Sequence, residues 1–109
     1  MTIPGFEDML HQAQHFAEQL AKLKEELARK SVSGTAGGGM VKVTADGRGR
    51  ILKVELEPQV VNSEEVEMLQ DLICAAVNQA LVAAKELSAQ ATQSLTGGMS
   101  IPGIDGLLG

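Results

Sequence analysis

The sequence predicts an α+β fold of order α-β-β-β-α, with two long helices and a three-stranded antiparallel sheet. Apolar residues recur with helical spacing in two long segments, and they alternate with polar residues over short stretches between those segments. Glycine-rich turns separate the short stretches. A chain of 109 residues is long enough for one domain, and folding alone buries only about 60 to 70% of its surface.

The first helix is predicted over residues 6 to about 30. Ser31 follows it, and the apolar positions within it repeat every three and four residues. This heptad spacing is typical of a helix with a coiled-coil-like seam along one side. The seam residues are Phe6, Met9, Ala13, Phe16, Leu20, Leu23 and Leu27.

Three strands are expected next. A short strand is predicted near residues 32–35, and a β-hairpin follows the Gly37-Gly38-Gly39 run. Pairing Val43 with Leu52 and Val41 with Val54 places the apolar residues of both hairpin strands on one face. These alternating patterns therefore predict both the hairpin and its register.

The predicted register has an electrostatic consequence. With residues 46–49 as the turn, Lys42 lies opposite Lys53 on the outer face of the hairpin. Like charges directly opposite each other destabilise a sheet, unless Glu55 on the diagonal or a bound anion compensates. This pair is a first indication of phosphate contact, with an unremarkable solvated surface as the alternative.

The second helix is predicted to run from a capping-box-like pair, Asn62 and Glu65, to about Leu95. Gly97-Gly98 is expected to end it. We therefore expect one domain over residues 1–98 and a flexible C-terminal tail over residues 99–109.

Helix length predicts projecting arms. At about 1.5 Å per residue the two helices reach roughly 37 and 45 Å, whereas an eight-residue strand covers about 26 Å. Helix ends should therefore extend beyond the sheet. The open sheet edges and the long apolar stripes predict a homodimer with protruding helical arms.

Charge is strongly segregated along the chain. Residues 22–53 carry eight cations against three carboxylates, a net charge of +5, whereas the remainder carries one cation against eleven carboxylates, a net charge of −10. This asymmetry favours a polyanion-binding region on an acidic body. The alternative is a soluble acidic protein with a few lysines on its surface.

Three of the four helix cations follow an acidic residue by four positions, the spacing of ordinary helix-surface ion pairs. Lys24 has no such partner, and Arg48 and Arg50 flank a glycine turn with only Asp46 nearby. The three helix pairs are Glu18–Lys22, Glu25–Arg29 and Glu26–Lys30. All eight cations are candidate DNA-binding residues: Lys22, Lys24, Arg29, Lys30, Lys42, Arg48, Arg50 and Lys53.

Nothing in the sequence indicates catalysis. No nucleophile elbow, P-loop or Cys/His ligand set is present, and the triple-glycine run enters a strand rather than a helix. His11 and His15 have a spacing that can bind metal, but their outward heptad positions favour solvated histidines. Cys74 is expected in the core. We therefore expect no enzyme activity, metal, cofactor or small-molecule substrate.

The order of several short motifs resembles the YbaB/EbfC family of bacterial nucleoid-associated proteins, over residues 6–104. The resemblance implies a tweezer-like homodimer that binds DNA and helps organise the nucleoid, without catalytic residues. It also favours contacts on the helical arms, whereas the unpaired cations favour the hairpin. The motifs are the Met9–Leu27 helix, Gly37-Gly38-Gly39-Met40-Val41-Lys42-Val43, Gly47, Val54-Glu55-Leu56-Glu57-Pro58, Glu67–Leu72, Ala75–Ala80, and Gly97-Gly98-Met99 with Ile101-Pro102-Gly103.

Duplex DNA is the expected ligand. Trp and Tyr are absent and both Phe residues belong to the seam, so no aromatic platform for unpaired bases is expected. The alternative is a dimeric protein-interaction scaffold that does not bind DNA physiologically. The sequence has neither a membrane-spanning apolar run nor an N-terminal signal pattern, and we expect a protein of the cytoplasm and nucleoid.

Overall fold

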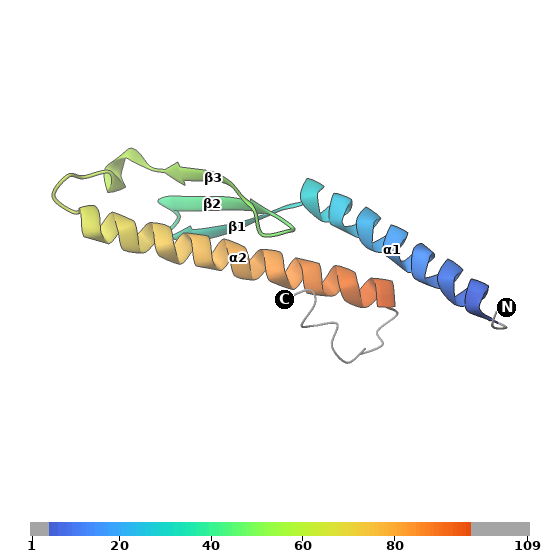
Figure 1. Cartoon of the computed structure of the whole chain (residues 1–109). Coiled ribbons are helices and arrows are strands. Elements are labelled where there is room, and N and C mark those ends of the chain that lie inside the picture. Colours follow the sequence, from blue (N-terminus) through green and yellow to red (C-terminus); the bar gives the residue numbers. More distant parts are fainter. Residues whose placement is uncertain (1–4, 97–109) are drawn as a thin grey trace.

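The computed structural model describes residues 5–96 and confirms the α-β-β-β-α order (Figure 1). A short 3-10 helix, not expected from the sequence, precedes the second long helix. The elements are α1 (Phe6–Arg29), β1 (Ser31–Ala36), β2 (Val41–Asp46), β3 (Ile51–Leu56), η1 (Pro58–Val60) and α2 (Val66–Thr96).

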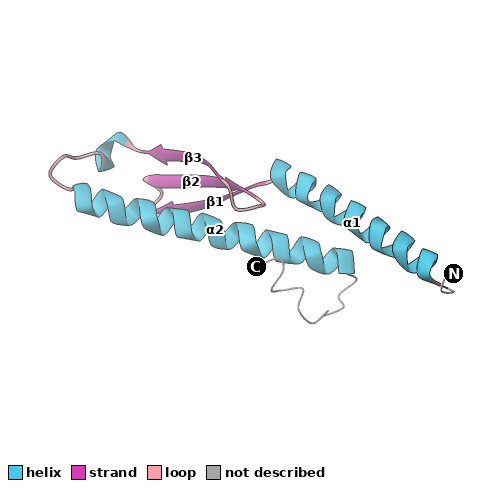
Figure 2. Ribbon diagram, viewed as in Figure 1, coloured by secondary structure: helices cyan, strands magenta, loops and turns pink. Residues whose placement is uncertain are grey.

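Strand β2 is central, paired antiparallel with β1 on one side and β3 on the other. Helix α2 lies against β1 and β2 on one face of this sheet (Figure 2). Gly34 permits the closest approach, since a Cβ there would lie 2.5 Å from the Ala80 backbone nitrogen and even closer to the Ala76 carbonyl oxygen. Beside it, the Thr35 backbone N–H donates to Gln79 Oε1 of α2. Side-chain bulk is therefore excluded where β1 crosses α2.

The core is a thin layer between β2 and α2. Small residues on the helix bring its backbone close to the valines of the strand. Val60 of η1 closes one end of this layer. The main buried residues are Val41, Val43, Ala45, Ala76, Ala80 and Ala84.

The predicted hairpin register is wrong by two residues. Val43 lies opposite Val54, and Lys42 lies opposite Glu55 rather than Lys53. A shift of two preserves the alternation of faces, so the apolar face was predicted correctly although the partners were not. The expected like-charged pair is therefore absent from this hairpin.

Two local features produce the shift. The Asp46 N–H donates to the Arg50 carbonyl oxygen at 2.8 Å, which leaves a three-residue loop over residues 47–49. Gly49 adopts φ +89°, the left-handed conformation that such a loop requires. Beyond it, Leu52 is an extra residue in β3, because Ala45 pairs with Ile51 while Thr44, the residue before Ala45, pairs with Lys53.

The start of α2 also differs from the prediction. Asn62 does not cap the helix: its Oδ1 accepts the Glu64 N–H at 3.0 Å and its carbonyl accepts the Glu65 N–H at 3.0 Å, which forms a separate turn. The helix begins at Val66. The predicted helix stop at Gly97-Gly98 and the predicted tail lie outside the described residues.

The molecule is elongated, with extents of 74 × 24 × 22 Å. Its radius of gyration is 19.8 Å, compared with about 13 Å for a compact chain of this length. Helix α1 leaves the sheet and projects well beyond it, and the C-terminal part of α2 also extends past the strands (Figure 1). The expected projecting arms are therefore confirmed.

Much apolar surface is uncovered in the single chain. Within the α1 seam only Leu27 is buried, and every residue of β3 is exposed because α2 lies under β1 and β2 instead. Cys74 is also exposed, so its expected place in the core is wrong for the isolated chain. The exposed large apolar residues include Phe6, Met9, Leu10, Ile51, Leu52, Val54, Leu56, Val66, Met68, Leu81 and Val82.

Helix α2 also leaves apolar surface uncovered along its length. By length and composition, the helix over Val66–Leu95 could cross a membrane, since its most apolar 18-residue stretch has a mean hydropathy of 1.3. The sequence was expected to contain no membrane-spanning apolar run, and by helix length and mean hydropathy this expectation is wrong. Only 11% of its most apolar stretch is buried, although its alanines pack on the sheet. Helices that form the core of soluble proteins have similar composition, and here the remaining surface is available to a second protein chain.

Replacing Gly34 with Ala should destabilise the fold by about 3 kcal/mol, because the new methyl group would overlap the α2 backbone and force the strand away. Urea denaturation followed by circular dichroism measures the loss. Ser33→Ala, on the exposed side of the same strand, is the control and should change stability by less than about 0.5 kcal/mol. A Gly34→Ala protein as stable as this control would contradict the close packing.

Candidate nucleic-acid interface

The cations of the described residues gather at one region of the elongated molecule. Helix α1 has no Lys or Arg before Lys22, and α2 has only Lys85. The first part of α1 instead carries Glu7, Asp8 and Glu18. The arm tip is therefore acidic, and positive charge begins where α1 approaches the sheet.

The β2–β3 turn is built around Asp46, whose side chain is 2% exposed. Its Oδ1 accepts the backbone N–H groups of Arg48 at 2.9 Å and Arg50 at 3.0 Å. Its Oδ2 accepts a longer hydrogen bond, 3.4 Å, from the Arg48 guanidinium. One carboxylate thus shapes the turn and orients the first arginine on it.

These contacts also set the acidity of Asp46. The hydrogen bond from the Arg50 backbone N–H is the main cause that lowers the pKa of Asp46 below its usual value. Burial opposes this shift, and the backbone hydrogen bond, guanidinium hydrogen bond and charge of Arg48 reinforce it. The side chain is therefore a carboxylate at neutral pH, and it partly neutralises Arg48.

The turn is fixed to the C-terminal end of α1. The Gly47 N–H donates to the Leu27 carbonyl oxygen at 2.8 Å and to the Lys30 carbonyl oxygen at 3.1 Å. A Cβ on Gly47 would lie only 2.7 Å from the same Leu27 oxygen. Glycine is required here for close approach, and this contact holds Arg48 beside the last turns of the helix.

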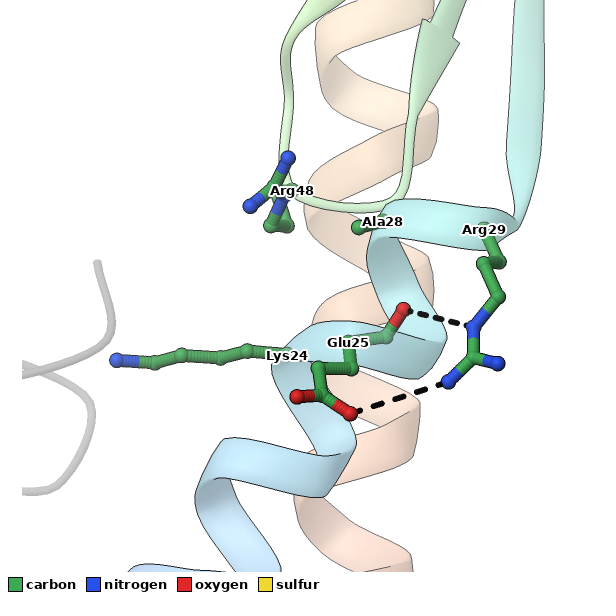
Figure 3. Close-up of a pocket in the computed structure, with 5 residues that line it drawn as sticks. All are labelled: Lys24, Glu25, Ala28, Arg29 and Arg48. Atoms are coloured by element: carbon green, nitrogen blue, oxygen red, sulfur yellow. Dashed lines mark hydrogen bonds and ion pairs between the residues drawn. The ribbon is translucent and has the colours of Figure 1, made fainter.

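An open cleft lies at this junction, lined by Lys24, Glu25, Ala28, Arg29 and Arg48. Figure 3 shows Arg48 near Ala28, Lys24 extending outward from α1 on the left of the view, and Arg29 turned to the other side. Three cations and one carboxylate thus come together from two segments that lie far apart in sequence. We call this site the arm-root cleft.

Only one of the three predicted helix ion pairs is formed. Arg29 contacts Glu25, with 4.0 Å between the guanidinium and the carboxylate and a 3.3 Å hydrogen bond from Nε to the Glu25 carbonyl oxygen. Both side chains are largely exposed, so this pair contributes little to stability. Over residues 5–96, neither Lys22 nor Lys30 forms the expected contact within 4.0 Å.

On the outer face of the sheet, a carboxylate accompanies the two lysines. Lys53 Nζ lies 2.7 Å from Glu55 Oε1, and the backbone pairing places Lys42 across from the same glutamate. The hydrogen bond with Glu55 raises the pKa of Lys53, and the same bond is the main cause that lowers the pKa of Glu55. The unrelieved repulsion expected between these two lysines is therefore not present.

The histidines form no metal site in the part of the chain that is described. His15 Nε2 lies 3.0 Å from the Gln19 side-chain amide, a hydrogen bond within one helix surface. No three His, Cys, Asp or Glu residues between 5 and 96 come together as metal ligands do.

Sequence reasoning missed two residues of this region. Asp46 was considered only as a nearby acid, although an aspartate before Gly-x-Gly commonly bonds the amides of its own turn. Glu55 was expected only diagonally across from Lys42, whereas it lies directly opposite Lys42. The bulge at Leu52 contributes to this shift, and it has no clear signal in the sequence. The arm-root cleft itself depends on the path of the chain and could not be found from spacing.

The fold and this basic junction together define a small α+β protein with acidic arm tips and a cationic arm root. The chain belongs to the YbaB/EbfC DNA-binding family, whose family model matches residues 2–99. This confirms the resemblance found in the sequence motifs.

Curated relatives from bacteria agree with this assignment. A nucleoid-associated protein of Thermoanaerobacter pseudethanolicus is 48% identical over 97 residues, covering 89% of this chain and 87% of the relative. One of Desulfotalea psychrophila is 44% identical over 100 residues, covering 92% and 94%. The crystal structure of an uncharacterized Helicobacter pylori protein shares the fold, with a TM-score of 0.76 and 20% identity over 84% of this chain and 96% of that chain.

Stability should depend on the ionisation of Asp46. The folded-state pKa lies below the unfolded value, so the carboxylate stabilises the fold above the unfolded pKa, and this contribution is lost as pH falls through the folded value. Relative to Asp46→Asn, the wild-type protein should therefore lose stability steadily below about pH 4. Urea denaturation at a series of pH values measures this difference. A stability difference that does not change with pH would contradict the assigned role.

Proposed function

We propose that this protein is a homodimeric nucleoid-associated protein that binds duplex DNA through the phosphate backbone and organises the bacterial nucleoid or modulates gene expression. The observation that carries this proposal is the concentration of eight cations between residues 22 and 53 of an otherwise acidic member of a DNA-binding family. The site of action is the nucleoid, within the cytoplasm.

Backbone contact, rather than base reading, is supported by the side chains available. The cations lie on a helix end, a turn and a sheet face, and no described helix presents a row of base-reading side chains. Both Phe residues belong to α1, away from the turn. Binding with weak sequence preference and strong salt dependence follows from such a surface.

Dimerisation is supported by the apolar surface that the single chain leaves open. Val54 and Leu56 lie beside buried valines of β2, yet they are 44% and 37% exposed. Strand β3 is also an unpaired edge, whereas α2 accepts a hydrogen bond at the β1 edge. A second copy covering β3 and the adjoining flank of α2 would bury the kind of surface that soluble monomers rarely expose.

The protein should sediment as a dimer at micromolar concentration, with twice the 11.4 kDa mass of one chain. Val54→Asp should produce folded monomers, because it places a charge in the proposed interface without disturbing the core. Ser33→Asp, on an exposed position of β1, should remain dimeric. Analytical ultracentrifugation with circular dichroism measures assembly and fold together. A folded wild-type monomer under these conditions would refute the dimer.

A second candidate is a dimeric scaffold that binds another protein and not DNA. The exposed Phe6, Met9 and Leu10 near the acidic arm tip favour it, because a cluster of this kind suits protein contact. Both candidates require the dimer, so the assembly state does not distinguish them.

Titration with a 30-base-pair duplex separates these two functions. DNA binding predicts saturable binding by fluorescence anisotropy at 50 mM salt, weakening steeply and log-linearly toward 200 mM. Single-stranded DNA of the same length should bind less tightly, since no aromatic platform is present. A scaffold predicts no saturable signal with either nucleic acid at 50 mM salt.

A further inference from the structure

We propose that the arm-root cleft is the phosphate-binding site of each protomer. Lys24 and Arg48 bind one phosphate of the DNA backbone there, and Asp46 positions Arg48. This inference rests on the proposed binding of duplex DNA. It goes further by assigning the contact to the junction between arm and turn, and not to the arm tips or the outer sheet face.

The local charges favour this junction over the outer face of the sheet and over Arg29. Lys42 and Lys53 both lie near Glu55, and the Lys53 ammonium already forms a 2.7 Å ion pair with it. Arg29 is turned toward Glu25 (Figure 3). Lys24, by contrast, forms no ion pair within the described chain, and it extends from the side of α1 on which Arg48 lies.

Arg48 is suited to hold an anion. Its side chain remains 47% exposed, and its contact with Asp46 uses one terminal nitrogen at 3.4 Å. A guanidinium has five N–H donors, so the others stay available for phosphate oxygens. Ala28, with its short side chain, keeps space open between this arginine and the helix.

The carbonyl end of a helix normally repels an anion. At the end of α1, hydrogen bonds to the last carbonyl oxygens weaken this repulsion. Two of the last carbonyl oxygens, those of Leu27 and Lys30, accept the Gly47 N–H. The Glu25 carbonyl accepts from Arg29 Nε, and the Glu25 carboxylate faces the Arg29 guanidinium. These contacts partly neutralise the negative charge at the end of α1.

The role of Asp46 follows from its burial. Its Oδ1 holds the two backbone N–H groups that give the turn its shape, and its Oδ2 restrains the guanidinium. The side chain is too enclosed to meet DNA itself. Asp46 therefore acts as a positioning residue, which reduces the side-chain freedom that Arg48 loses when it binds.

The test uses two double variants that remove the same charge from the full-length protein. Lys24→Gln with Arg48→Gln empties the cleft, and Lys42→Gln with Lys53→Gln is the matched control on the sheet. Binding to a 30-base-pair duplex is measured by anisotropy from 50 to 200 mM salt. With one phosphate lost per protomer, the cleft variant should flatten the log-log salt slope of a dimer by about 1.8 and weaken binding on the order of 50-fold at 100 mM salt.

The control removes two cations that lie outside the cleft, so it should weaken binding clearly less than the cleft variant and flatten the salt slope by less. Equal slopes and affinities for the wild type and the cleft variant would overturn the cleft while leaving DNA binding intact. A flatter salt dependence of DNA binding in the control, and not in the cleft variant, would place the phosphate contacts on the sheet face. A wild-type protein that binds no duplex would refute the proposed function and the cleft together.

Asp46→Asn distinguishes positioning from simple charge. It removes a negative charge near the site, so a purely electrostatic role predicts tighter binding, whereas a positioning role predicts binding about tenfold weaker. Circular dichroism confirms that the variant is folded. Arg48→Lys tests the planar donor group itself: it keeps the charge, and it should also bind about tenfold more weakly. Unchanged or tighter binding by Asp46→Asn would overturn the positioning role of Asp46, and unchanged or tighter binding by Arg48→Lys would overturn the phosphate contact of the Arg48 guanidinium.

Discussion

The arrangement of this protein depends on a close backbone contact between the β2–β3 turn and the end of α1. Gly47 donates to the Leu27 and Lys30 carbonyl oxygens, and no side chain fits at its position. The contact ends the helix, fixes the direction in which the arm leaves the sheet, and brings Arg48 beside the last turns of α1. A second close approach, at Gly34 in the middle of β1, fixes α2 against the same sheet. Two glycines thus determine how both helices meet a small sheet.

This geometry explains how an acidic protein can contact a polyanion. The carboxylates lie mainly at the arm tip and around the start of α2, while the cations lie from Lys22 to Lys53. Under the proposed function, repulsion from the acidic ends would limit where a duplex can approach, and the charge pattern would favour the arm root. In the proposed dimer, the apolar residues of β3 and α2 would be buried by a second copy, which would set two arm roots at a fixed separation.

The sequence was sufficient for the order of elements, because the heptad seam and the strand alternation are local patterns that follow the period of a helix and of a strand. It was not sufficient for the register of the hairpin. Asp46 closes a three-residue loop and Leu52 forms a bulge, and their combined shift of two leaves the alternation of faces unchanged. Periodicity cannot detect such a shift. For the same reason the cation candidates could not be ranked from the sequence, since the partners of Lys42 and Lys53 depend on that register.

The central claim is that DNA meets the arm root. The most direct measurement is an NMR titration of isotope-labelled protein with a short duplex, which follows each backbone amide. The structure predicts the largest shifts over residues 24–30 and 46–50, in both segments at the same DNA concentration. Shifts confined to residues 6–21 of the arm, or to the outer face of β3, would contradict it.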